Sequence, residues 1–160
     1  MRLCNASMIT MSLIAPVMAA PTKPKPMPGK CAPVNRLFLR ALAKVEHEPN
    51  TKPPIRDNGK AVGCLQIWPI YVREANRILG FPAFNEKDRW DREACYEMTR
   101  IVLTHWSRHW ARKGYNIGPA ELCSMHLHQH DWSPKNLLTK KEEIRTKRLY
   151  KWLHHYSKKR

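Results

Sequence analysis

The chain has 160 residues, of which 42% are hydrophobic and 26% are charged, and its formal net charge is +16 at pH 7. This length favours one domain with a modest core over a multidomain protein. The excess of Lys and Arg indicates anionic partners, which for an exported protein are cell-wall polymers, lipopolysaccharide or anionic lipid head groups.

The first residues have the pattern of a secretory signal peptide. Arg2 precedes an apolar run from Met8 to Met18, and Val17-Met18-Ala19 places small residues where a signal peptidase cuts. We therefore predict a signal peptide at residues 1–19 and a secreted or periplasmic protein. An uncleaved membrane anchor is the alternative, although the run is short for a membrane span. Cleavage would remove Arg2 as the only charged side chain and leave a net charge of about +15.

A segment rich in Pro and Lys follows at residues 20–32. Such a composition favours extended, solvated backbone that does not pack into a core. We therefore predict a tether at residues 20–32, a folded domain at residues 33–157 and a basic tail at residues 158–160.

Four cysteines remain beyond the signal peptide, at Cys31, Cys64, Cys95 and Cys123. An even number in an oxidising compartment predicts two disulfides with three possible pairings, and buried free thiols are the alternative. No Cys-x-x-Cys spacing is present, so a zinc ribbon is not expected.

The first predicted helix runs from Val34 to Glu48, because apolar residues recur there at three- and four-residue spacings. Pro49 ends it, since the residue before a proline avoids the helical region. Asp57-Asn58-Gly59 is a strong signal for a tight turn or hairpin. The following segment, Ala61 to Ile67, fits a short strand or an extended approach.

Proline and glycine mark the next helices. Pro69 begins a helix that runs to Leu79, after which Gly80 and Pro82 close it. A longer helix is predicted from Asp91 to Trp110, with an inner face formed by Ala94, Met98, Ile101, Val102 and His105.

Two more helices complete the predicted fold. Pro119 begins one of them. Thr139 and Glu142 have the spacing of a capping box and begin the last one, whose buried stripe is predicted to be Leu149, Trp152, Leu153 and Tyr156. The fold class is therefore mainly α, a compact helical domain with at most a small β-hairpin near residues 55–67.

Glu46 is the candidate catalytic residue. It lies four residues after Leu42, at the edge of the apolar stripe, and in the final turn of its helix. Burial and the negative end of the helix dipole both favour the protonated carboxyl, which is the form that a general acid requires. A surface glutamate in a fraying turn is the alternative.

Two segments around Glu46 resemble motifs of the lysozyme-like lytic transglycosylase family. Glu46 and Asn50 match the ends of the motif Glu-Ser-Gly-Gly-Asn, while His47-Glu48-Pro49 stands between them. Gly63-Cys64-Leu65-Gln66-Ile67 is similar to Gly-Leu-Met-Gln-Ile, with Gly63, Gln66 and Ile67 identical in place.

A third segment, Tyr115-Asn116-Ile117-Gly118-Pro119, is similar to Tyr-Asn-Ala-Gly-Pro at every position but one. The three segments follow the order of the family, and the resemblance extends over about Val34 to Tyr156. Tyr150 matches an aromatic residue of the family's C-terminal helix.

The resemblance implies a lysozyme-like α+β domain that cleaves the β-1,4 bond between N-acetylmuramic acid and N-acetylglucosamine in peptidoglycan. Glu46 would protonate the glycosidic oxygen and then act as base toward the sugar's 6-hydroxyl or toward water, so anhydro and hydrolysed products both remain open. The implied substrate-binding residues are Gly63, Leu65, Gln66, Ile67, Tyr115, Asn116 and Tyr150. No cofactor or metal is expected, the partners are peptidoglycan strands and other anionic envelope polymers, and we expect a monomer.

Two other functions remain open from the sequence. The altered loop after Glu46 fits a module that binds peptidoglycan or an anionic wall polymer without turning it over. The net charge also fits a basic nucleic-acid-binding protein, although nucleic acid is not the expected partner and the helical spacing of Trp152 and Tyr156 favours core packing over base stacking.

Two clusters of polar residues have simpler explanations than chemistry. Asp57 stands in a turn sequence, so we predict a turn residue there and not a second catalytic carboxylate. His126, His128, His130 and Asp131 raise the possibility of zinc, but no HExxH pattern accompanies them, and surface or groove-lining histidines fit better.

Overall fold

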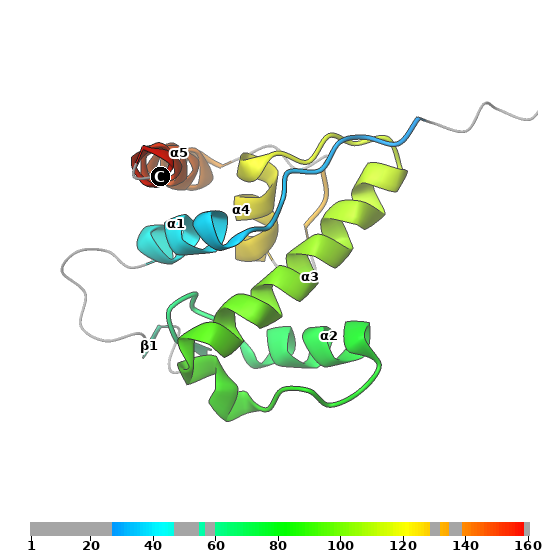
Figure 1. Ribbon diagram of the computed structural model, residues 1–160, viewed down its shortest axis with the longest axis vertical. Helices are drawn as coiled ribbons and strands as arrows, with labels where there is room; N and C mark the ends of the chain where they lie inside the picture. The colour runs from blue at the N-terminus through cyan, green and yellow to red at the C-terminus, as the bar shows by residue number, and fades with distance from the viewer. Residues whose placement is uncertain (1–26, 47–54, 57–59, 129–131, 135–138, 159–160) are drawn as a thin grey trace, which may run out of the picture.

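The computed structural model describes residues 27–46, 55–56, 60–128, 132–134 and 139–158, and it confirms a mainly α domain with a small hairpin (Figure 1). In chain order the elements are α1 (Arg36–Glu46), β1 (Ile55–Arg56), β2 (Ala61–Val62), α2 (Pro69–Leu79), a 3-10 helix η1 (Glu86–Trp90), α3 (Arg92–Arg112), α4 (Pro119–His128) and α5 (Lys140–Ser157). Within these residues, no helix combines the length and the apolar character that crossing a membrane requires.

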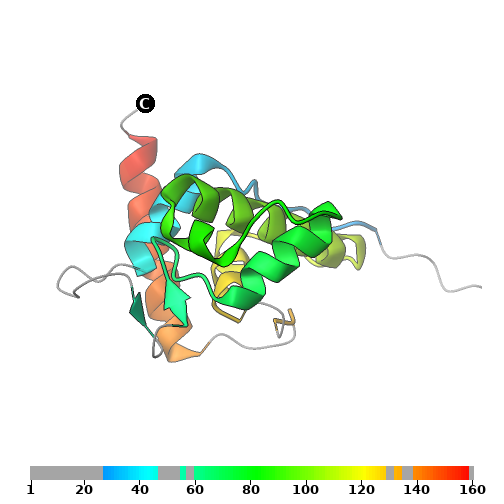
Figure 2. The ribbon, with the colours of Figure 1, turned by 90° about the horizontal axis from the view of Figure 1, so that it is seen from below.

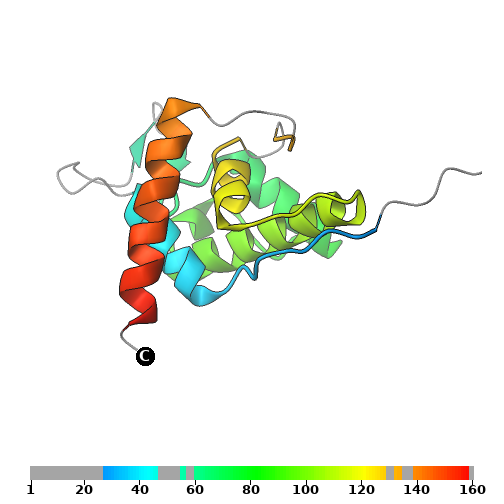
Figure 3. The same ribbon diagram turned by 90° about the horizontal axis from the view of Figure 1, so that it is seen from above.

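The long helix α3 crosses the middle of the domain. Helix α2 packs on one side of it, and α1, α4 and α5 gather on the other side (Figures 1 and 2). Helix α5 lies along α1 (Figure 3). The core between them is formed mainly by fully buried side chains, among them Leu42, Leu65, Ile67, Tyr71, Met98, Leu103, Ile117, Leu122 and Leu149.

Helix α1 carries its apolar residues on the face that meets this core. The Oδ1 atom of Asn35 accepts a hydrogen bond from the backbone N–H of Phe38 at 3.0 Å, so Asn35 caps the helix and α1 begins at Arg36 rather than at Val34. Its last helical residue is Glu46. Residues 47 and 48, which the sequence prediction included, lie outside the described residues.

The hairpin is short, and the segment that follows β2 turns back toward it. Ile55 and Arg56 pair antiparallel with Val62 and Ala61, and the predicted turn at residues 57–59 lies outside the described residues. Residues 63–66 form a turn that brings Ile67 back to Val62 through a pair of backbone hydrogen bonds. The prediction of a strand or extended segment over residues 61–67 is therefore wrong beyond Val62.

The remaining helices begin where their capping residues predict. Helix α2 has the predicted bounds and ends at Gly80, whose φ is +82°. The Asp91 carboxylate accepts from Ala94 N–H at 2.7 Å, so α3 begins at Arg92. The preceding helix η1 was not predicted.

The predicted buried faces of the two longest helices are confirmed in part. In α3, Met98 and Val102 are buried, whereas Ala94, Ile101 and His105 are only half-buried. In α5, Leu149 is buried, and the other three residues of the predicted stripe are half-buried against the core. The capping box of Thr139 and Glu142 is present.

The folded part begins earlier than predicted. The backbone N–H of Gly29 donates to Ala111 at 2.7 Å, and Lys30 and Ala32 each form a backbone hydrogen bond with Ile117. Residues 29–32 are thus attached to the domain and are not tether. The predicted signal peptide, the tether up to residue 26 and residues 159–160 of the basic tail lie outside the described residues.

The four cysteines beyond the predicted signal peptide are free thiols, whereas the sequence predicted two disulfides. Cys31 is exposed, and its thiol donates to the carbonyl of Ser107 at 3.3 Å. Cys123 is buried in α4. Cys64 and Cys95 lie close enough together for each thiol to shift the pKa of the other.

Candidate functional site

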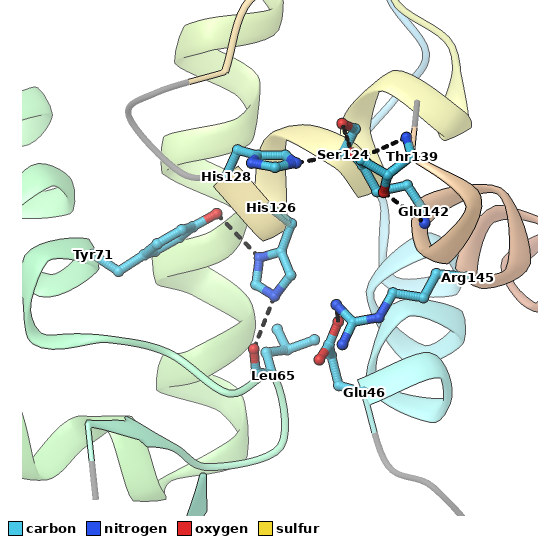
Figure 4. Close-up of polar contacts among 9 residues, drawn as sticks. All are labelled: Glu46, Leu65, Tyr71, Ser124, His126, His128, Thr139, Glu142 and Arg145. Carbon is cyan, nitrogen blue, oxygen red and sulfur yellow. Dashed lines mark hydrogen bonds and ion pairs between the residues drawn. The ribbon is translucent and has the colours of Figure 1, made fainter. Parts of the chain in front are cut away.

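Glu46 ends α1 with its carboxyl inside the protein. Only 4% of the residue is exposed, and the side chain faces Leu65 and Arg145 (Figure 4). Its Oε1 atom lies 3.6 Å from Nη1 of Arg145 on α5, and no group in the described part of the chain forms a hydrogen bond with it. A buried polar atom without a hydrogen bond is rare in proteins, so this carboxyl is a candidate for chemistry rather than for structure.

His126 of α4 lies next to this carboxyl and is held at both ring nitrogens. Nε2 lies 2.8 Å from the carbonyl of Leu65, so Nε2 carries the proton and donates it (Figure 4). Nδ1 then accepts from the hydroxyl of Tyr71 at 3.3 Å. Burial lowers the pKa of His126, against the attraction of Glu46. The imidazole is therefore neutral, and one tautomer is fixed.

The surroundings of Glu46 contain few other charges. Tyr71 is fully buried, and this burial raises the pKa of its hydroxyl far above its ordinary value. Burial, followed by the charge of Glu46, raises the pKa of the Cys123 thiol to about 12. Because these groups and His126 stay neutral near pH 7, Arg145 is the cation that faces Glu46.

The Gly63–Ile67 turn brings Leu65 and Gln66 into the same region. Leu65 and Ile67 are fully buried, and Leu65 contributes its carbonyl to His126. Gln66 has a φ of +52°, in the left-handed region that glutamine rarely adopts. Its Nε2 donates to the Gly63 carbonyl at 3.0 Å, while its buried Oε1 has no hydrogen-bond partner. The turn thus presents a second unpartnered acceptor.

Gly63 allows the backbone of η1 to approach the Gly63–Ile67 turn closely. Its φ is +77°, and a Cβ at this position would lie 1.9 Å from the carbonyl oxygen of Arg89. The buried guanidinium of Arg89 in turn donates from Nη1 to the carbonyls of Lys60 and Ile67 at 2.9 and 3.1 Å. Gly63, which the resemblance places among the substrate-binding residues, thus packs directly against η1 and α3 in this structure.

A second buried carboxylate, Glu142, anchors α5 and so positions Arg145. It accepts hydrogen bonds from Ser124 at 2.6 Å, from His128 at 2.9 Å and from the Thr139 N–H at 2.8 Å (Figure 4). Burial acts to raise the pKa of Glu142, but these hydrogen bonds outweigh it and lower the pKa to about 2. Arg145 follows three residues later and faces Glu46.

Three predicted site residues lie elsewhere. Tyr115 packs edge-on against Trp110 with ring centres 5.7 Å apart, and the exposed Asn116 accepts from the Lys30 N–H. This segment joins the end of α3 to α4, away from the end of α1 that carries Glu46 (Figures 1 and 3). Tyr150 is 48% exposed and lies more than one helical turn beyond Arg145. The structure places Glu46 beside Leu65, which precedes Gln66 in the Gly63–Ile67 turn, whereas Tyr115, Asn116 and Tyr150 lie elsewhere.

Sequence reasoning missed the role of His126 and did not single out Arg145. His126 was considered only as a metal ligand or as a surface or groove-lining residue, although it follows buried Leu122 by one helical turn, which indicates an inward face. No local pattern distinguishes Arg145 from the other cations of α5. Within the described residues no group of three or more potential ligands could hold a metal ion, and Asp57, His130 and Asp131 lie outside those residues.

Comparisons with family models, with curated proteins and with solved structures found no match to this chain.

Proposed function

We propose that this chain is an exported peptidoglycan-cleaving glycosidase that acts on the bond between N-acetylmuramic acid and N-acetylglucosamine, with Glu46 as its acid and base. The observation that carries the proposal is the buried carboxyl of Glu46, which has an unpartnered oxygen and lies beside the Gly63–Ile67 turn. The resemblance of the segments at Glu46 and at Gly63–Ile67 to lytic transglycosylase motifs supports the same function.

The proposed reaction needs one carboxyl group. Glu46 gives its proton to the glycosidic oxygen as the bond to the sugar breaks, and the resulting carboxylate then takes a proton from the sugar's 6-hydroxyl or from water. Neutral His126 adds no charge that competes for this proton, and it fixes the Leu65 carbonyl at the edge of the site.

Gln66 supplies a matching contact for the sugar. Its Oε1 is a buried acceptor that lacks a donor, and the N-acetyl groups of peptidoglycan carry amide N–H donors. Because Oε1 of Gln66 and Oε1 of Glu46 are both covered in this structure, binding requires a local displacement of the side chains that cover them. The energy of the new hydrogen bonds would favour that displacement.

The experiment is to incubate the protein with purified peptidoglycan and to measure the soluble muropeptides released. Glu46→Gln, which keeps the shape of the side chain but cannot act as the acid, should reduce release by about 100-fold or more. Glu143→Gln, at an exposed position of α5, is the matched control and should leave release unchanged. Mass spectrometry separates anhydro from hydrolysed products, which differ by one water. Equal release by the wild type and Glu46→Gln would rule out this mechanism.

A second candidate function is a binding module that grips peptidoglycan without cleaving it. Arg145 favours it, because its guanidinium lies 3.6 Å from Oε1 of Glu46, and this ion pair gives the buried carboxyl a structural partner. Arg145→Met separates the two functions. In an enzyme the substitution should change the amount of muropeptide released, whereas in a binding module peptidoglycan is retained in a pull-down and nothing is released by either form.

A further inference from the structure

Cys64 and Cys95 form a thiol pair on the side of α1 that Arg40 and Lys44 occupy. Cys64 is half-buried and lines a cavity of ≈ 290 Å³, while Cys95 on α3 is fully buried. The Cys95 thiol donates a hydrogen bond to the Arg89 carbonyl at 2.8 Å, and it lies close enough to Cys64 for each thiol to shift the pKa of the other. One thiol is thus reached from the cavity and the second stands directly behind it.

The cavity that leads to Cys64 is strongly basic. Arg40, Lys44 and Arg92 line it together with the phenol side chains of Tyr96 and Tyr156, and its lining contains no acidic residue. The Arg40 guanidinium lies 4.7 Å from the centre of the Tyr156 ring, and such a cation–π contact restricts where the charge can move. A small ligand that carries negative charge fits this lining.

The two thiols differ in acidity in a way that assigns their roles. The hydrogen bond with Cys95 lowers the pKa of Cys64, and Arg92 adds to the effect against the cost of burial. The hydrogen bond with Cys64 and then burial raise the pKa of Cys95 far above its ordinary value. Cys64, which lines the cavity and has the lower pKa, therefore attacks first, and the buried Cys95 reacts second.

We propose that Cys64 and Cys95 are oxidised to a disulfide by exchange with an anionic low-molecular-weight disulfide that docks in the basic cavity. The Cys64 thiolate attacks one sulfur of the donor, forms a mixed disulfide and releases one donor thiolate. Cys95 then loses its proton to solvent and attacks Sγ of Cys64, which releases the second donor thiolate. Overall, two protein thiols and one donor disulfide give one protein disulfide and two donor thiols.

Capping Cys64 prepares the second step. The leading cause that keeps Cys95 protonated is its hydrogen bond to Cys64, and the charge of the Cys64 thiolate adds to it. Both disappear when Cys64 becomes part of a mixed disulfide. The product would tie the Gly63–Ile67 turn to α3 by a covalent bond. The proposal stands on the thiol pair and the cavity, and its test does not use peptidoglycan release.

The test begins with the fully reduced protein and oxidised glutathione as the anionic donor. Intact mass and peptide mapping should show a transient glutathione adduct on Cys64, followed by an internal link between Cys64 and Cys95. Cys95→Ser should trap the adduct, and Cys64→Ser should form no internal link. Cystamine, a disulfide with two positive charges, should react more slowly, and Arg92→Gln should slow the reaction with glutathione disulfide about fivefold.

Exposed Cys31 provides the matched control, because Cys31→Ser should leave both the internal link and its rate unchanged. Mapping of the native wild-type protein needs no variant and therefore does not depend on the folding of the serine variants. Oxidation at Cys31 alone, a link that involves Cys123, or a rate with cystamine equal to that with glutathione disulfide would overturn the proposal.

Discussion

Two buried glutamates of this protein differ in how their oxygens are used. Glu142 is 6% exposed and accepts hydrogen bonds from Ser124, His128 and Thr139. Glu46 is 4% exposed, yet its Oε1 has no hydrogen bond and faces Arg145 at 3.6 Å. Burial is the same in both, so it does not separate the two roles. Hydrogen-bond saturation does, because a saturated carboxylate is held for structure and an unsaturated one is available for chemistry.

The largest difference in stability is expected between Glu142→Gln and Glu46→Gln. Glu142→Gln removes the charge that Ser124, Thr139 and His128 stabilise, and it should lower the free energy of unfolding by about 3 kcal/mol. Glu46→Gln breaks no hydrogen bond but removes the charge that faces Arg145 at 3.6 Å, so it should cost about 1 kcal/mol, less than Glu142→Gln. Urea denaturation of both variants measures the difference. Equal losses would show that the two carboxylates have the same role.

The pH dependence of stability tests the same carboxylate without a substitution. Glu142 has its pKa lowered from 4.5 to about 2 in the folded protein, so the unfolded chain binds its proton first as the pH falls. Ionised Glu142 should therefore contribute its full stabilisation to the wild type above pH 4.5, and the free energy of unfolding should fall by about 3 kcal/mol as the pH approaches 2. Over this range Glu142→Gln should show a shallower loss in thermal or urea unfolding. A parallel loss in both proteins would assign the effect to other carboxylates.

An intermediate effect on stability is expected for substitution of His126. Both of its ring nitrogens are hydrogen-bonded, as the Glu142 oxygens are, but the ring lies beside Glu46. His126→Phe leaves the Leu65 carbonyl and the Tyr71 hydroxyl without their partner and should destabilise the fold by about 2 kcal/mol. Tyr71→Phe removes only the 3.3 Å contact and should cost about 1 kcal/mol or less. Under conditions where both variants are folded, muropeptide release should fall further in His126→Phe. Equal release in the two variants would show that His126 does not shape the site.

The smallest change in stability is expected for Gln66→Gly. Glycine relieves a φ of +52°, which gains about 1 kcal/mol, and it loses the hydrogen bond to Gly63, which costs about the same. Unfolding should therefore change by less than about 1 kcal/mol, while peptidoglycan cleavage falls about tenfold because the Oε1 acceptor is gone. Unchanged cleavage would remove Gln66 from the site.

Elements set by local chemistry could be predicted from the sequence. Pro69 and Gly80 mark the bounds of α2, and Thr139 with Glu142 marks the start of α5, because each signal acts within one helical turn. Glu46 could be placed inside for a similar reason, since its spacing from Leu42 follows the helical repeat. Its partners could not, because Arg145 and His126 reach it only after α1, α4 and α5 have packed together.

The position of Tyr115 and Asn116 away from Glu46 has a physical explanation. Asn, Gly and Pro in succession favour a turn wherever they occur, so the match to a family motif carries little information on position in space. In the structure this turn joins α3 to α4 and binds the segment around Lys30 instead. The η1 helix was missed for the converse reason, because its cap at Asn85 and Asp88 occupies a segment without apolar periodicity.

The first turns of α5 carry both the carboxylate that anchors the helix and the guanidinium that faces Glu46. Glu142 binds the helix to α4, and Arg145, three residues after Glu142, lies next to the Glu46 carboxyl. Each residue of an α-helix advances the azimuth by about 100°. Substitutions at the exposed positions 143 and 144 should therefore be tolerated, but inserting or deleting a single residue there would rotate the Arg145 guanidinium away from the Glu46 carboxyl. The segment between Glu142 and Arg145 should therefore tolerate substitutions better than insertions or deletions.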